Sequence, residues 1–305
     1  MPKQYCHIAN GRSLLQAALC RAEGFTTAAR TFVIIKRDHL PLASTQLGAV
    51  PERNVIVQPE NRDTGPGLLL SLLHVLRRDP AALLAVLPSD HYVGDEAAFL
   101  THVDRAAEIV RRLPDKIALI GIPPDRVEPG YGYVLPALPL AGATSAAAFH
   151  VATFYEKPAT DVAARLLTQG ALWNSFVMVF RVSRMLELLQ RHLPDRVVRF
   201  DGVVDDAAAL EHVYRDLPPW NFCRDFLHHV PEHLVVVRAD GTGWSDWGDA
   251  GSGNAHDGGA RRRGGLARPS PCGGTGRRGP IPNRPWSGPA SVRCHDGCDL
   301  IAGAQ

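Results

Sequence analysis

The chain has 305 residues, of which 45% are hydrophobic, so it can bury the core of one large α/β domain. Its 33 basic residues nearly balance 31 acidic ones, and a net charge of +2 gives no overall attraction to nucleic acid or membranes. No apolar run reaches the roughly 18–20 residues that span a bilayer, and the start lacks the apolar stretch of a signal peptide. We therefore expect a cytoplasmic protein with free thiols, and the sequence leaves a homo-oligomer open.

Residues 1–247 alternate short apolar runs with helical patterns. The expected strands are Thr31–Lys36, Asn54–Val57, Ala81–Leu87, Lys116–Ile122, Val151–Tyr155, Phe176–Arg181 and Leu234–Arg238. The expected helices are Leu14–Ala22 with Ser13 as its cap, Leu68–Arg78, Glu96–Arg112, and Arg184–His192 with Ser183 as its cap. This order predicts an α/β fold with a doubly wound, mainly parallel sheet, whose ligands lie outside the carboxyl ends of the strands.

Residues 248–305 have a different composition. They hold 14 of the 28 glycines, six prolines and eight arginines, without any periodicity, so we expect no regular structure there. Our hypothesis for this tail is a frameshift in GC-rich DNA, which retranslation in the other frames would test. The segment Cys294–Cys298 has only one cysteine pair, which does not favour a metal site. The arginines alone are weak support for nucleic-acid binding.

Two carboxylates follow expected strands. Asp90 comes just after the run Ala81–Leu87, and Asp246 comes after Leu234–Arg238. Carboxylates at the carboxyl ends of parallel strands suit Mg²⁺, which takes one or two protein oxygens and completes its shell with phosphates and water. Taken singly, Asp90 fits a turn or helix cap equally well, and Asp246 fits a solvated loop.

Two loops contain glycines near the expected ligand edge. The loop Gln58–Gly67 opens a helix, whose first N–H groups can hold a phosphate or a base edge, but it has neither glycine-rich nucleotide fingerprint. In Gly130–Tyr133, two glycines alternate with two tyrosines, so a ligand can approach the backbone and pack on an aromatic ring. Ordinary connections and tight turns explain both loops as well.

Three further polar residues border strands. Lys157 offers a point charge for a phosphate, and the neighbouring Glu156 can accept from sugar hydroxyls. Asn174 precedes Phe176–Arg181 and can also bind a sugar hydroxyl. The alternatives are a surface ion pair for the first two and a turn residue for Asn174.

The order of these motifs resembles that of the mannose-1-phosphate guanylyltransferases, over about residues 2–247. The matching segments are Pro2–Gln4, Ser13–Gln16, Gln58–Thr64, Leu87–His91, Gly130–Tyr133, Glu156–Pro158, Trp173–Ser175 and Gly243–Asp246. The resemblance implies a Rossmann-like fold of the nucleotide-diphospho-sugar transferase type. It also implies transfer of GMP from GTP to mannose 1-phosphate, which yields GDP-mannose and pyrophosphate.

The resemblance also implies residue roles. Lys3, Asp90, Lys157 and Asp246 would be catalytic, Asp90 and Asp246 would hold Mg²⁺, and Lys157 would bind the sugar phosphate. The nucleotide would contact Gln58, Asn61, Arg62 and Thr64. The sugar would contact Gly130, Tyr131, Gly132, Glu156 and Asn174.

The chain departs from the family at its start. The family begins with an apolar strand and a Gly-Gly-x-Gly-Thr-Arg loop before the Pro-Lys motif, whereas here Met1 directly precedes Pro2. We expect the missing strand to belong in the middle of the sheet, where its loss leaves backbone groups of its neighbours unpaired. A poorly folded and nearly inactive chain would follow. Upstream DNA that encodes the strand and loop in frame would indicate a miscalled start.

Two other functions compete with this one. A non-catalytic remnant would bind sugar phosphate through Lys157 without any transfer. A nucleotidyltransferase for glucose 1-phosphate would differ only in its sugar. Assays that compare the two sugar phosphates with GTP and UTP would separate these alternatives.

Overall fold

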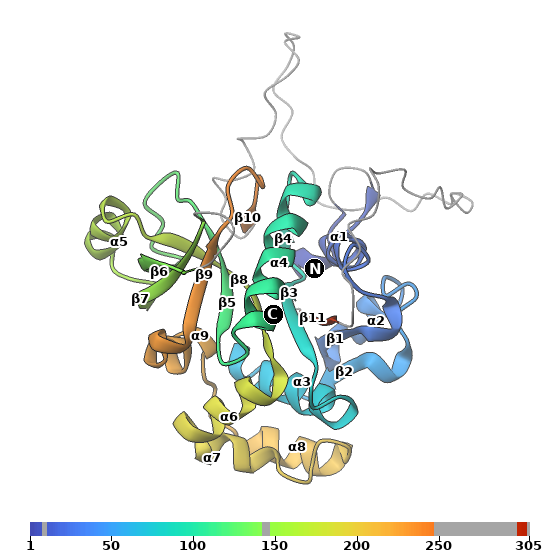
Figure 1. The fold of residues 1–305 in the computed structure, drawn as a ribbon. Coiled ribbons are helices and arrows are strands. Elements are labelled where there is room, and N and C mark those ends of the chain that lie inside the picture. Colours follow the sequence, from blue (N-terminus) through green and yellow to red (C-terminus); the bar gives the residue numbers. More distant parts are fainter. Residues whose placement is uncertain (8–10, 142–146, 247–297, 304–305) are drawn as a thin grey trace.

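The computed structural model describes residues 1–7, 11–141, 147–246 and 298–303 (Figure 1). Most of the tail, residues 248–297, lies outside these ranges. The segment Cys294–Cys298, considered above as a metal site, therefore lies outside them except for Cys298. Among the described residues, no helix is long and apolar enough to cross a membrane.

A nine-stranded sheet forms the centre of the molecule, with strand order β2-β1-β11-β3-β8-β5-β9-β7-β6. Its strands are β1 (Thr31–Lys36), β2 (Val55–Gln58), β3 (Leu83–Pro88), β5 (Ile117–Ile122), β6 (Gly132–Pro139), β7 (Ala148–Glu156), β8 (Leu172–Arg181), β9 (Leu234–Arg238) and β11 (Cys298–Gly303). The short strands β4 (His91–Tyr92) and β10 (Ser245–Asp246) form a separate ladder. All seven strands expected from the apolar runs are present, with ends that differ by up to four residues.

The expectation of a mainly parallel sheet is wrong for one half of it. Strands β2, β1, β11 and β3 are parallel, and β5 is parallel to β9. However, β8 runs antiparallel to both β3 and β5, and β6 and β7 pair antiparallel with each other. The connection from Pro139 to Ala148 is too short for the crossover that parallel neighbours need, so these two strands form a hairpin.

The tail contributes a central strand. The expectation of no regular structure after residue 247 is wrong for Cys298–Gly303, because β11 pairs in parallel with β1 on one side and β3 on the other. The expectation that the neighbours of a missing central strand carry unpaired backbone groups is therefore also wrong. A six-residue segment with apolar residues, Leu300 and Ile301, suffices to continue the ladder on both sides.

Helices cover both faces of the sheet. They are α1 (Leu14–Ala22), α2 (Leu40–Ala43), α3 (Thr64–Arg78), α4 (Glu96–Arg112), α5 (Thr160–Thr168), α6 (Val182–His192), α7 (Pro194–Val197), α8 (Ala207–Asp216) and α9 (Phe222–Asp225). Alternate residues of each strand enter two cores. Phe32 and Ile34 pack in one core with α3, α6 and α9, whereas Val33 and Ile35 pack in the other with α1 and α4.

Local sequence explains most helix starts. Ser13 caps α1 as expected, and the structure adds Gln16, whose side chain completes a capping box. Helix α3 begins at Thr64, four residues before the expected start, because Asp63 caps it and Pro66 is tolerated in a first turn. The expected cap of α6 is wrong: the helix begins at Val182, whose N–H donates to the Ala82 carbonyl, so Ser183 has no cap role.

Candidate active site

The two predicted metal carboxylates meet through the small ladder of β4 and β10. Asp246 lies opposite His91 in this antiparallel pair, and Asp90 directly precedes β4. Both carboxylates contact the ammonium of Lys3, at 3.0 Å from Asp90 Oδ2 and 2.5 Å from Asp246 Oδ1. The side chains of Asp90 and Asp246 are 11% and 28% exposed, so the group lies in a crevice open to a ligand.

Two glycines let this ladder close. Gly243 has φ of +58°, and a Cβ at this position would lie 3.2 Å from the Gly94 Cα atom. The N–H groups of Gly94 and Asp95 both donate to the Thr242 carbonyl, at 3.0 and 2.9 Å. Only glycine adopts the left-handed conformation freely at such a close backbone approach, so this residue places Asp246 beside Asp90.

Lys3 reaches the carboxylates because the next residues anchor it. The 3₁₀ turn Lys3–Tyr5 buries Gln4 and Tyr5 in the core that contains α1. Burial lowers the pKa of Lys3, but Asp90 and Asp246 together outweigh it and hold the pKa above its ordinary value. Lys3 is therefore a permanent cation between two carboxylates.

His91 and Trp244 pack behind this group. The Trp244 indole N–H donates to His91 Nδ1 at 3.3 Å, and the two rings meet edge to face. An indole nitrogen only donates, so Nδ1 accepts and the His91 proton resides on Nε2. That nitrogen lies 3.8 Å from Asp90 Oδ1. Burial lowers the pKa of His91, which keeps the ring neutral beside the lysine.

The predicted sugar residues line the same cleft, which has a volume of about 150 Å³. Gly132 begins β6 and lies opposite Glu156 at the end of β7. A Cβ on Gly132 would lie 2.9 Å from Glu156 Oε2 and 3.2 Å from Asn174 Cβ, so the glycine leaves room for a ligand between them. Thr64, Gly130, Tyr131 and Lys157 also line this cleft.

Backbone strain is concentrated at the cleft. Among the described residues other than glycine, positive φ values occur at Asp63 (69°), Lys157 (48°) and Phe176 (58°). Lys157 and Phe176 line the cleft, and Asp63 directly precedes its wall residue Thr64. Such conformations cost about 1–3 kcal/mol each and persist where the surrounding structure holds them, which is typical of ligand sites.

Three predicted nucleotide residues do not line the cleft. Gln58 is 5% exposed, and its Oε1 accepts from the Tyr214 hydroxyl at 3.4 Å. Asn61 accepts from the Asp63 N–H, which forms a local turn. Arg62 donates to the carbonyls of Tyr214 and Arg215 at the end of α8. These contacts are structural, and a role in nucleotide binding stays a prediction.

The cleft includes residues that the sequence pattern missed. Asn221 and Cys223 belong to the start of α9, and Phe176 lies in β8. The segment around Asn221 follows no apolar strand, and the left-handed backbone of Phe176 has no sequence signature. The one signal that the sequence offers for Asn221 is that asparagine favours helix caps. In the structure it caps α9, where its side chain accepts from the Arg224 N–H.

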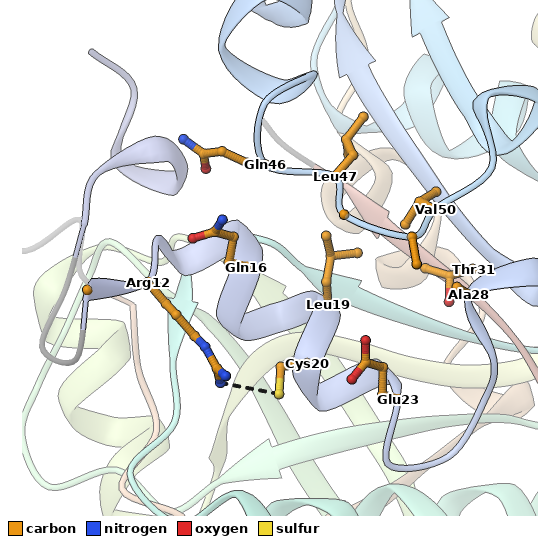
Figure 2. A pocket seen from close by; sticks show the side chains of 13 residues that line it. Arg12, Gln16, Leu19, Cys20, Glu23, Ala28, Thr31, Gln46, Leu47 and Val50 are labelled. Carbon is orange, nitrogen blue, oxygen red and sulfur yellow. Dashed lines mark hydrogen bonds between the residues drawn. The ribbon is translucent and has the colours of Figure 1, made fainter. Parts of the chain in front are cut away.

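A second pocket, of about 370 Å³, lies beside α1 and the segment 46–50 (Figure 2). The described residues that line it include Arg12, Gln16 and Cys20, and a single carboxylate, Glu23. None of the predicted site residues is among them. The smaller cleft, where two aspartates, Glu156 and two lysines converge, is therefore the candidate active site.

Asp90 and Asp246 fit a hard cation that needs further ligands from its substrate. Their oxygens already surround one positive charge, the Lys3 ammonium. No group of three or more His, Cys, Asp or Glu residues in the described part of the chain could hold a metal by itself. This pair therefore suits Mg²⁺ bound jointly with phosphate oxygens and water.

Comparisons with known proteins agree with the predicted resemblance. The family model described as nucleotidyl transferase matches residues 1–253. The mannose-1-phosphate guanylyltransferase 2 of Escherichia coli O157:H7 is 30% identical over 267 residues, which cover 81% of this chain and 53% of the relative. The corresponding ManC protein of Salmonella typhimurium is 32% identical over 267 residues, with the same coverage. This chain thus spans about half the length of these curated relatives.

A solved structure has the same fold. A mannose-1-phosphate geranyltransferase from Thermus thermophilus superposes with a TM-score of 0.71 at 29% identity, over 80% of this chain and 69% of the other.

Proposed function

Because this chain belongs to the nucleotidyl transferase family, we propose that it transfers GMP from GTP to mannose 1-phosphate and releases pyrophosphate. The observation that carries the proposal is one cleft that joins a Lys3–Asp90–Asp246 cluster to Lys157 and Glu156. The first group suits a triphosphate, and the second suits a sugar phosphate. The similarity to mannose-1-phosphate guanylyltransferases supports this choice of substrates.

The reaction needs positioning and charge compensation more than covalent help from the protein. A phosphate oxygen of mannose 1-phosphate attacks the α-phosphorus of GTP, a new P–O bond forms, and the bond to the β-phosphate bridge breaks. Pyrophosphate carries away the electron pair of the broken bond. The protein aligns the two reactants and offsets the charge that develops on the leaving group.

Each cleft residue has a task in this scheme. Lys157, exposed at the end of β7, pairs with the sugar phosphate. Glu156 and Asn174 face the gap above Gly132 and bind sugar hydroxyls. Lys3 binds phosphate oxygens of the nucleotide. Burial raises the pKa of Glu156 above its ordinary value, and the charge of Lys157 offsets part of this rise; the carboxylate form accepts from hydroxyls.

Asp90 and Asp246 would hold Mg²⁺ in this proposal. When bound, the ion would neutralise charge on the phosphate oxygens. Lys3, whose ammonium contacts both aspartates, would bind a phosphate oxygen beside them.

The test is an assay of the whole 305-residue chain with Mg²⁺. GTP or UTP is paired with mannose 1-phosphate or glucose 1-phosphate, and the nucleotide sugars are separated by chromatography. We expect GDP-mannose to dominate and Lys157→Ala to abolish most of its formation. The same assay gives the rate of transfer by this chain.

Two outcomes would contradict the proposal. Formation of a glucose nucleotide in preference to GDP-mannose would identify glucose 1-phosphate, and not mannose 1-phosphate, as the sugar substrate. Binding of mannose 1-phosphate without any nucleotide sugar from any pair would support the non-catalytic remnant instead.

A further inference from the structure

Cys223 is a cleft residue without a part in the chemistry above. It belongs to α9, is 3% exposed, and lies in the wall of the cleft beside the sugar residues. Asn174 donates to its sulfur, and Glu156 interacts with it electrostatically; these are the side chains proposed to bind the sugar. A thiol between these groups can orient both of them.

The Asn174 side chain has a fixed orientation. The Phe176 N–H donates to Asn174 Oδ1 at 3.2 Å, and a backbone N–H can only donate. The amide nitrogen therefore points the other way, where Nδ2 donates to Cys223 Sγ at 3.5 Å. The sulfur thus accepts from Asn174 and leaves its own proton for another partner.

The Glu156 carboxylate lines the same cleft and is the partner that we infer for this proton. A hydrogen bond from the thiol favours the ionised form of Glu156 and so opposes the effect of burial, which raises its pKa. Burial first, and then the charge of Glu156, raise the pKa of the Cys223 thiol, so it stays protonated and donates. Asn174 thus donates to Cys223, and Glu156, whose pKa the thiol lowers, lines the same cleft.

The thiol is held firmly in this place. The Phe222 N–H donates to Thr64 Oγ1 at 2.9 Å, and Asn221 Nδ2 donates to Asp63 Oδ1 at 3.1 Å. These bonds tie the start of α9 to the start of α3. The Phe222 ring packs against Phe226 and Trp220 in the core. A residue on so rigid a support can fix the rotamers of its neighbours.

We propose that Cys223 is a positioning residue, whose thiol orients the Asn174 amide and the Glu156 carboxylate toward the sugar of the sugar 1-phosphate. The inference rests on the proposed function and extends it to a residue outside every recognised motif. The thiol itself acts through these two neighbours.

The experiment compares Cys223→Ala, Cys223→Ser and Cys223→Val in the whole chain. Calorimetry measures the binding of mannose 1-phosphate without nucleotide, and the transfer assay gives KM for each substrate and kcat. We expect Cys223→Ala and Cys223→Val to weaken sugar phosphate binding by about tenfold, the effect of one lost hydrogen bond. KM for GTP should change less than twofold. Cys223→Ser, which keeps a donor and an acceptor, should bind within about twofold of the natural chain.

The controls separate positioning from folding and from the proposed function. Cys20→Ser alters a half-buried cysteine outside the cleft, and thermal unfolding of every variant reports loss of structure. Cys223→Val keeps the buried volume if Cys223→Ala folds poorly. Equal sugar phosphate binding by the alanine, valine and natural chains would overturn the inference, and so would a serine variant as weak as alanine. If the natural chain does not bind the sugar phosphate, the proposed function fails before any variant is compared.

Discussion

At the scale of single residues, the cleft depends on a few contacts that tolerate little change. Lys3 bridges two carboxylates, and Gly132 leaves a gap in front of Glu156 and Asn174. The charged cluster suits the triphosphate, whereas the gap suits the sugar. Substitutions in the cluster and at the gap should therefore affect different kinetic constants.

Asp246→Asn should lower kcat by on the order of 100-fold or more, because an amide cannot replace a carboxylate in the charge balance with Lys3 and Mg²⁺. KM for the sugar phosphate should change little. The matched control is Asp240→Asn, since Asp240 is exposed and pairs with Arg238. Steady-state kinetics over a range of Mg²⁺ concentrations would check this. Similar losses in both variants would argue against a special role for Asp246.

Gly132→Ala should raise KM for the sugar phosphate by about tenfold or more while the chain stays folded. The added methyl group would lie 2.9 Å from Glu156 Oε2 and displace the carboxylate from the sugar. KM for GTP should stay near its natural value. Unchanged binding of the sugar phosphate in calorimetry would show that the sugar lies elsewhere.

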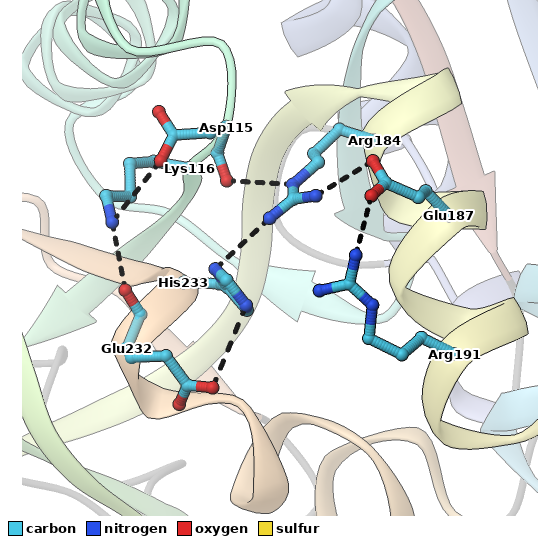
Figure 3. A network of polar contacts seen from close by, with 7 residues as sticks. All are labelled: Asp115, Lys116, Arg184, Glu187, Arg191, Glu232 and His233. Atoms are coloured by element: carbon cyan, nitrogen blue, oxygen red, sulfur yellow. Dashed lines mark hydrogen bonds and ion pairs between the residues drawn. The ribbon is translucent and has the colours of Figure 1, made fainter.

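At the scale of elements, a polar network joins α6 to the segments before β5 and β9 (Figure 3). Arg184 donates to the Asp115 carbonyl, to Glu187 and to His233 Nδ1. Lys116 donates to the Glu232 carbonyl, and Arg191 contacts Glu187. Since a guanidinium only donates, Nδ1 accepts, and this contact requires the neutral ring of His233.

The free energy of unfolding should therefore fall as the pH drops below about 6.5, the ordinary pKa of histidine. Burial, and then Arg184, lower the pKa of His233, so in this range the unfolded chain binds a proton more readily than the folded chain. Urea unfolding between pH 7.5 and 5 would measure the loss. His233→Asn, which keeps an acceptor, should show a smaller fall, whereas the exposed control His212→Asn should match the natural chain. Equal slopes in all three chains would contradict the prediction.

At the scale of the whole molecule, β11 joins the tail to the rest of the fold. It lies between β1 and β3, and Gly303 is opposite Pro88, two residues before Asp90. Each interior N–H of this strand faces a neighbouring strand, because both sides are paired. The order of the sheet beneath the cleft therefore depends on a segment far from the cleft in the sequence.

Leu300→Pro should lower the free energy of unfolding by about 2–3 kcal/mol or prevent folding, because proline removes one ladder hydrogen bond and leaves a buried acceptor unpaired. Leu300→Val keeps the N–H and should change stability by less than about 1.5 kcal/mol. Urea unfolding compares the two variants. Equal stability of the proline and valine chains would contradict a central place for β11.

A disulfide cross-link would test in a second way whether β11 lies beside β3. Cys298 lies opposite Leu83 in the register of β11 and β3. Neighbouring strands are close enough for a disulfide, so Leu83→Cys should join to Cys298 within one chain on mild oxidation. Mass spectrometry of proteolytic fragments would identify the bond, and Leu83→Cys with Cys298→Ser is the control. If these disulfides form only between two protein molecules, β11 pairs with β3 of a second copy and not with β3 of its own chain.

Local patterns in the sequence predicted much of this protein. Apolar runs indicated β1 and β9 to the residue, and Ser13 indicated the start of α1. Asp90, Lys157 and Asp246 were identifiable because each follows a strand. The shared edge of parallel strands accounts for the two aspartates, whereas Lys157 reaches the cleft through the antiparallel pairing of β7 with β6. These features depend on neighbours within a few residues, which a sequence displays directly.

The tertiary structure alone decided the rest. Pairing of β11 with β1 and β3 depends on backbone partners more than 200 residues away, and composition gives no sign of them. The antiparallel direction of β8 depends on where the chain returns to the sheet. Cys223 reaches the cleft because α9 packs on α3, and Gln58 turns to Tyr214 because of α8. Sequence patterns determine which segments form, whereas burial and pairing over the whole chain determine which side chains meet.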